Sequence, residues 1–150
     1  MVMAIIAASS AFGWMMTILR VPDMATTAIL AISSNPWIIL LLINLILIIL
    51  GLFMDMAPMI LITTPILMPI AVGVVGMDPV HFGIVLLLNL GISLITPPVG
   101  TVLFVGCSIG RTTIESVIRP LLPYYAIMIV VLLMVTYIPM ISMWLPGFLN

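Results

Sequence analysis

The sequence predicts an all-α integral membrane protein, and two observations carry this prediction. Of the 150 residues, 65% are hydrophobic and 5% are charged, and the mean hydropathy is +1.55, well above that of soluble globular domains. The apolar residues also form long stretches, such as 36–54 and 79–107, which are long enough for a helix to cross a bilayer. A helix satisfies its own backbone polar groups in hydrocarbon, so we expect each stretch to be helical.

Composition excludes several classes of function. The basic residues are three arginines, too few to neutralise nucleic-acid phosphates, so we exclude nucleic acid as a partner. Cys107 is the only cysteine, which excludes an internal disulfide and a cysteine-based metal cluster. Paired carboxylates are missing, and no nucleophile has a base at a defined spacing. We therefore do not expect an enzyme.

The first part of the chain predicts two helices of different kinds. Residues 1–20 are apolar up to Arg20 and predict a spanning helix. Pro22 and Asp23 then mark a new helix start. Residues 22–34 mix Thr, Ser and Ala with apolar residues and are too short to span. We expect this segment to be a helix that lies along the membrane interface.

Residues 36–71 admit two interpretations. The apolar run is interrupted between Gly51 and Pro58, where Asp55 stands, and then resumes. The two halves are either full spans joined by a tight turn, or the arms of a re-entrant hairpin whose tip lies near the membrane midplane. Prolines and glycines divide the second half into short pieces, which favours the re-entrant hairpin.

Residues 79–107 predict a broken helix. The apolar stretch contains Thr96-Pro97-Pro98-Val99-Gly100, and prolines lack the N–H that a helix needs and clash with the preceding turn. Carbonyls near Thr96 are therefore expected to lack helical partners. Irregular backbone at membrane depth survives only inside protein or beside water, and a helix broken in this way is typical of a transporter's ion or substrate site.

The chain ends in a predicted polar connection and a last span. Gly110 to Arg119 contains most of the charge in this region. Residues 120–146 predict the final spanning helix. We expect aromatic residues near the ends of this span to act as interfacial anchors, namely Tyr124, Tyr125, Tyr137 and Trp144.

Oxygen-bearing groups at the hairpin tip and at the helix break predict one Na⁺ site. Asp55 has apolar runs on both sides, and an ionisable group at membrane depth is a functional-site candidate; the alternative is a solvated turn aspartate. For Thr96 the alternative is a hydroxyl that eases a proline kink. Hard oxygen ligands suit a hard cation. We predict Na⁺, the only bound ion or cofactor expected, on Gly51, Asp55, Thr96 and Val99, with structural breaks at Pro58, Pro97, Pro98 and Gly100.

Four motifs in this order carry a family resemblance. They are GLFMDMAP at 51–58, TPILMPI at 64–70, GMDPVHFG at 76–83 and TPPVG at 96–100. Together they resemble the C-terminal part of the large membrane subunit of tripartite ATP-independent periplasmic (TRAP) transporters, and the similarity covers essentially the whole chain.

This resemblance implies a function. The family imports organic acids such as C4-dicarboxylates, sialic acid or other sugar acids, driven by a Na⁺ gradient and without ATP. The implied partners are a periplasmic substrate-binding protein, a small membrane subunit and the lipid bilayer. The implied location is the cytoplasmic (inner) membrane of a bacterium or archaeon.

The resemblance also implies an elevator-type architecture of two inverted repeats. This chain resembles the second repeat, with an arm helix at 22–34, the re-entrant hairpin at 36–71 and the broken helix at 79–107. The first-repeat half is then a further partner, without which this chain is not expected to transport. Thr101-Val102 stand where the family commonly has Leu-Asn, which weakens any transfer of substrate contacts. The alternative function is a structural or assembly membrane protein without its own ion site.

Overall fold

The computed structural model describes residues 2–97 and 100–147, and within these residues every regular element is a helix, as predicted. Met1, Pro98, Val99 and residues 148–150 lie outside the described residues. The elements are α1 (Val2–Ile18), α2 (Val21–Ile32), α3 (Pro36–Gly51), α4 (Met56–Met68), the π-helix η1 (Pro69–Val74), α5 (Pro79–Ile95), α6 (Thr101–Ile109), α7 (Ile114–Tyr137) and α8 (Pro139–Gly147).

Two helical segments of the described chain are long and apolar enough to cross a bilayer. They are Met56–Val74, which joins α4 and η1 over 19 residues, and the 24-residue α7. A third crossing results if α1 and α2 are counted as one span, with a bend of 66° between them. The helical membrane class predicted from hydropathy is therefore confirmed.

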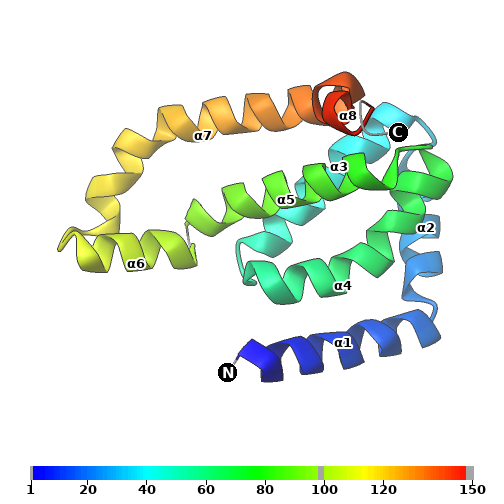
Figure 1. Cartoon of the computed structure of the whole chain (residues 1–150), viewed down its shortest axis with the longest axis horizontal. Coiled ribbons are helices and arrows are strands. Elements are labelled where there is room, and N and C mark those ends of the chain that lie inside the picture. Colours follow the sequence, from blue (N-terminus) through cyan, green and yellow to red (C-terminus); the bar gives the residue numbers. More distant parts are fainter. Residues whose placement is uncertain (1, 98–99, 148–150) are drawn as a thin grey trace.

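The helices lie in rows that bring the hairpin against the broken helix. Figure 1 shows α1 below α4, with α3 and α5 in the middle and α7 crossing above them. α3 packs on α5, and α1 packs on α4. α6 continues to one side after the break, and α7 returns from there toward α8 (Figure 1). The turn between α3 and α4 thus lies on the same side of the molecule as the break between α5 and α6 (Figure 1).

A close backbone approach fixes α1 on α4. Gly13 is buried, and a Cβ atom added there would lie 3.3 Å from the Leu61 carbonyl oxygen. The residue that would donate to this carbonyl within α4 is Pro65, which has no N–H. A small residue on the neighbouring helix lets the two backbones meet over the freed carbonyl.

The second arm of the hairpin is not divided into short pieces, so that part of the sequence prediction is wrong. Pro58 lies in the first turn of α4, where a missing N–H costs no helical bond. Pro65 is inside α4, and Pro69 opens the π-helix. The Val75 N–H donates to the Ile70 carbonyl at 3.2 Å, five residues back. This wider turn lets the helix continue past a residue without an N–H.

The last long helix begins earlier than predicted. α7 starts at Ile114, so the polar connection is shorter than Gly110 to Arg119, and both Glu115 and Arg119 lie on the helix. Pro120 and Pro123 are inside α7, which bends in its first half (Figure 1), as prolines require.

This earlier start also moves the aromatic residues relative to the helix. α7 ends at Tyr137, and Pro139 opens α8 after Ile138, since the residue before a proline disfavours the helical region. Tyr124 and Tyr125 therefore stand near the middle of α7, while Tyr137 stands at its end. The predicted place of Tyr124 and Tyr125 near a helix end is wrong.

Buried polar side chains join three helices in the core. Asn89 of α5 donates from Nδ2 to Asn44 Oδ1 of α3 at 2.6 Å and to the Val85 carbonyl at 2.8 Å. Asn44 Nδ2 in turn donates to Thr136 Oγ1 of α7 at 3.1 Å. All three side chains are buried. Interhelical hydrogen bonds of this kind help to hold membrane helices together, because lipid tails are as apolar as the side chains and the hydrophobic effect does not favour helix–helix contact over helix–lipid contact.

Removing the Asn89 amide should loosen the contact between α3 and α5. Asn89→Ala deletes two donated bonds and leaves Asn44 Oδ1 without its donor, so we expect unfolding to become easier by about 1 to 3 kcal/mol. Unfolding of the purified transporter in detergent measures this. Leu87→Ala is the control, because Leu87 is on the same helix and 47% exposed. Equal losses in both variants would contradict a structural role for the Asn pair.

Candidate functional site

The hairpin tip is seated on the broken helix through a glycine. α3 ends at Gly51, which is buried against α5. A Cβ atom added at Gly51 would lie 2.5 Å from Ser93 Oγ and 2.6 Å from Ser93 Cβ. Ser93 donates to the Asn89 carbonyl at 2.9 Å, and its oxygen lies 3.4 Å from the Ile48 carbonyl of α3. Only glycine leaves room for this approach.

The break brings backbone carbonyls close together. α5 ends at Ile95, and a Cβ atom added at Gly100 would lie 2.9 Å from the carbonyl oxygens of both Leu94 and Thr96. The Gly100 N–H donates to the Thr96 carbonyl at 3.2 Å. The helical donor for the Leu94 carbonyl would be residue 98, a proline without an N–H. The break therefore leaves at least one carbonyl that a helix would have satisfied.

Two further groups at the break already have partners. The Thr96 hydroxyl donates to the Ile92 carbonyl at 2.7 Å, so its proton points back along α5 while its lone pairs remain free to bind a cation. The Ile95 carbonyl accepts a hydrogen bond from the Tyr125 hydroxyl of α7 at 2.6 Å. Thr96 can therefore serve as an oxygen ligand, whereas Ile95 is already bonded.

A small cavity lies where tip and break meet. Its volume is about 10 Å³, at the lower limit of the space that one water molecule needs. Beside it, Thr101 Oγ1 of α6 lies 3.5 Å from Asp55 Oδ1, at the long limit of a hydrogen bond. Asp55 itself is exposed in this chain. The lining residues are Gly51, Leu52, Met54, Ser93, Leu94, Gly100 and Thr101.

Of the residues predicted for the ion site, Gly51 lines this cavity, and Asp55 lies beside it through Thr101. Thr96 directly follows α5, and its hydroxyl donates back to Ile92, so the predicted meeting of Asp55 and Thr96 stays a prediction. Val99 and Pro98 lie outside the described residues. No cluster of three or more His, Cys, Asp or Glu side chains that could hold a metal ion occurs in residues 2–97 and 100–147. The junction thus offers hydroxyl, carbonyl and single carboxylate oxygens.

Sequence reasoning missed Ser93 and Thr101. Ser93 follows Asn89 by one helical turn, and this spacing places both side chains on the face of α5 that meets α3. That spacing was the available signal. Thr101 directly follows the break, and its hydroxyl reaches Asp55 only because the tip folds back onto α6; nothing in the local sequence predicts that contact.

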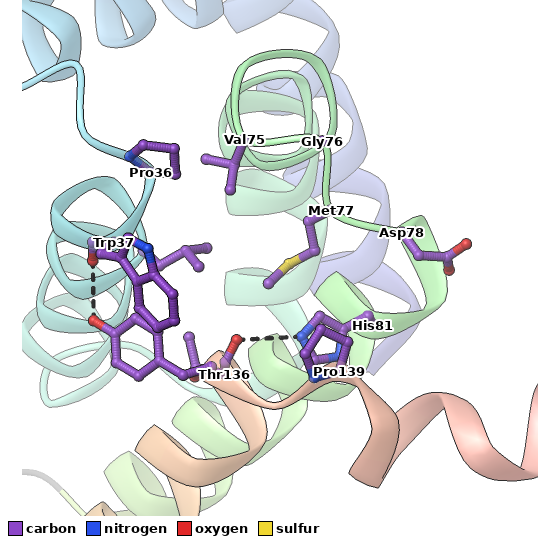
Figure 2. A pocket seen from close by; sticks show the side chains of 11 residues that line it. Pro36, Trp37, Val75, Gly76, Met77, Asp78, His81, Thr136 and Pro139 are labelled. Atoms are coloured by element: carbon purple, nitrogen blue, oxygen red, sulfur yellow. Dashed lines mark hydrogen bonds between the residues drawn. The ribbon is translucent and has the colours of Figure 1, made fainter.

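The opposite end of the hairpin closes around an apolar pocket of about 440 Å³ (Figure 2). The rings of Trp37 and Tyr137 stack with centroids 4.9 Å apart, and the Tyr137 hydroxyl donates to the Trp37 carbonyl at 2.9 Å. Buried His81 has Nε2 at 3.4 Å from the Thr136 carbonyl and Nδ1 against the Ser142 hydroxyl. These contacts tie the hairpin base to α7, and α5 to α7 and α8.

Filling the space at Gly51 should separate tip and break. Gly51→Ala places a methyl group on Ser93, and we expect a loss of about 1 to 3 kcal/mol of stability. The control is Gly91→Ala, where an added Cβ meets nothing within 4 Å and alanine favours the helix. Unfolding of both variants in detergent measures the difference. Ser93→Gly should rescue Gly51→Ala, and equal behaviour of the two alanine variants would contradict the contact.

Comparisons with known proteins agree with this arrangement of motifs. The family described as "Tripartite ATP-independent periplasmic transporter, DctM component" matches residues 1–141. "Uncharacterized protein YgiK" of Salmonella typhimurium is 50% identical over 145 residues, 97% of this chain and 33% of its own length. The C4-dicarboxylate TRAP transporter large permease protein DctM of Pseudomonas aeruginosa is 40% identical over 100% of this chain and 35% of its own.

A third relative has a different substrate in its name. The sialic acid TRAP transporter large permease protein SiaM of Vibrio cholerae is 39% identical over 90% of this chain and 31% of its own length. The chain thus spans about a third of the length of these relatives. Since the family match covers nearly all of the sequence, this chain belongs to the DctM component family of tripartite ATP-independent periplasmic transporters, a family of transport permeases and not of enzymes.

Proposed function

We propose that this chain is the C-terminal part, the second inverted repeat, of the large membrane subunit of a Na⁺-coupled importer of organic acids. The observation that carries the proposal is the junction at which the turn after Gly51 meets the break after Ile95. Carbonyls freed at membrane depth need a shared polar environment, and transporters place their ion sites at such breaks.

The contacts of α3 with α7 support a re-entrant hairpin. At its base, Trp37 is bonded to Tyr137 at the end of α7. At its tip, Gly51 meets Ser93, two residues before the Ile95 carbonyl that Tyr125 binds. Tyr125 lies midway along the 24-residue α7. At 1.5 Å per residue, the 16-residue α3 is roughly 24 Å long and the 24-residue α7 roughly 36 Å, so α3 runs beside only part of α7.

The groups at the junction fit a hard cation. The Leu94 carbonyl, whose helical donor would be a proline, the Thr96 carbonyl and the lone pairs of the Thr96 hydroxyl supply neutral oxygens, and Asp55 supplies one charge beside Thr101. Bound Na⁺ would supply a positive charge attracting oxygens of both the tip and the break. We propose as ligands Gly51, Asp55, Thr96 and Val99, as the sequence predicts, joined by Ser93 and Thr101.

The chain's own residues then couple the ion to the hairpin. Gly51 and Asp55 belong to the turn, whereas Ser93, Thr96 and Thr101 belong to the broken helix. A site shared between two elements binds its ion best when both are in contact. Organic-acid affinity and Na⁺ affinity are therefore linked through the position of the tip, and each raises the other.

The family supports a proposal for the substrate class and the partners. Relatives of this chain are named for C4-dicarboxylates and for sialic acid, so we propose an organic acid as the substrate class. We further propose a periplasmic binding protein, a small membrane subunit and the first-repeat half as partners, in an elevator-type transporter of the bacterial or archaeal cytoplasmic membrane. Residues 22–34 are then the arm helix that lies along the membrane interface.

Changing Asp55 should weaken the response to Na⁺. In the intact transporter, Asp55→Asn removes the charge but keeps the shape, and we expect about tenfold more Na⁺ for half-maximal uptake. Thr96→Val and Thr101→Val each remove one hydroxyl, and each should raise the Na⁺ concentration for half-maximal uptake by about fivefold. Uptake of an organic acid into proteoliposomes across a Na⁺ series measures these shifts.

Asp23→Asn is the matched control, because Asp23 is an exposed acid on α2 far along the chain from the junction. It should leave the Na⁺ dependence unchanged. If Asp55→Asn and Thr96→Val both leave it unchanged as well, these residues are not part of the ion site, and Asp55 is a solvated turn residue.

A further inference from the structure

One hydrogen bond joins α7 to the break. The Tyr125 hydroxyl donates to the Ile95 carbonyl at 2.6 Å, and this contact is partly buried. Ile95 is the last residue of α5, and the last carbonyls of a helix have no donor within it. At membrane depth such a group needs a partner. Tyr125 supplies that partner from another helix.

The course of α7 places this tyrosine over the break. Pro120 and Pro123 interrupt the first half of α7, and Figure 1 shows the helix bending there before it crosses above α5. Tyr125 follows the second proline by two residues. Its neighbour Tyr124 is 62% exposed. Of this adjacent pair, Tyr125 is thus the one that turns inward.

Holding the Ile95 carbonyl also constrains its neighbours. The Ile95 peptide plane shares a Cα atom with the plane on either side, so holding it fixes the Cα positions from which the neighbouring carbonyls project. The neighbouring carbonyls are those of Leu94 and Thr96, and the oxygens of both would lie 2.9 Å from a Cβ atom added at Gly100. Because the Ile95 carbonyl already accepts this hydrogen bond, it is also a weaker ligand for a cation than a free carbonyl.

We propose that Tyr125 is a positioning residue for the Na⁺ site: its hydroxyl holds the end of α5 so that the oxygens of Leu94 and Thr96 stay in the geometry that binds the ion. This inference rests on the proposed function and adds a residue of α7 to it. Tyr125 does not touch the ion. It acts through the Ile95 peptide.

Tyr125→Phe tests the proposal, because it removes one hydroxyl and keeps the ring. In the intact transporter, we expect about three- to tenfold more Na⁺ for half-maximal uptake, with the maximal rate at saturating Na⁺ retained. Tyr124→Phe is the matched control and should match the wild-type protein. A uniform loss of maximal rate with unchanged half-saturation would indicate a merely structural role and overturn the proposal.

A binding measurement without transport keeps the test independent of transport rate. Na⁺ should raise the unfolding temperature of the purified protein, since it binds the folded state. Tyr125→Phe should need about three- to tenfold more Na⁺ for the same rise. If Tyr125→Phe matches the wild type while Asp55→Asn does not, only the role of Tyr125 fails. If Na⁺ raises the unfolding temperature of neither the wild type nor the two variants, the proposed Na⁺ site is wrong, and this inference is wrong with it.

Discussion

Backbone carbonyls that lose their helical donor, at prolines and at the end of α5, are the constraint on which this structure depends. In an apolar surrounding each freed carbonyl costs several kcal/mol unless a partner reaches it. The chain uses a different solution at each place: Gly13 lets α1 approach the Leu61 carbonyl, a π-helix carries the chain past Pro69, and the Tyr125 hydroxyl binds the Ile95 carbonyl. The packing of α1, η1 and α7 follows from these three needs.

The two ends of α5 differ in their packing: side chains near its start are buried and hydrogen-bonded to other helices, whereas its end borders a small cavity. Toward its start, His81 and Asn89 are buried and bonded to α7 and α3, while the apolar Trp37 and Tyr137 rings close the hairpin base. Toward its end, Ser93 and Thr101 line a small cavity at the hairpin tip. Side chains spaced by four residues along one face of α5 connect the two ends. The hairpin is thus fixed at its base and held by few contacts at its tip.

Much of this fold could be predicted from the sequence, because Gly, Pro and hydropathy carry most of its signals. The turn around Asp55 and the break after Thr96 follow from local residue types. Long-range contacts do not: Thr101 reaching Asp55, and Tyr125 reaching Ile95, depend on how α6 and α7 return. Pro65 and Pro69 misled the prediction because α4 runs on through Pro65 and the π-helix begins at Pro69 without a gap. The start of α7 was misplaced because Pro120 and Pro123 stand inside the helix.

The central claim is that the hairpin tip touches the segment after the break inside the membrane. In a Cys107→Ser background, which removes the only native cysteine, the pair Asp55→Cys and Thr101→Cys should be joined rapidly by a short bifunctional thiosulfonate in native membranes. Asp55→Cys with Ile109→Cys should not be joined, because position 109 lies roughly 12 Å further along α6. Equal cross-linking of both pairs, or of neither, would contradict the account.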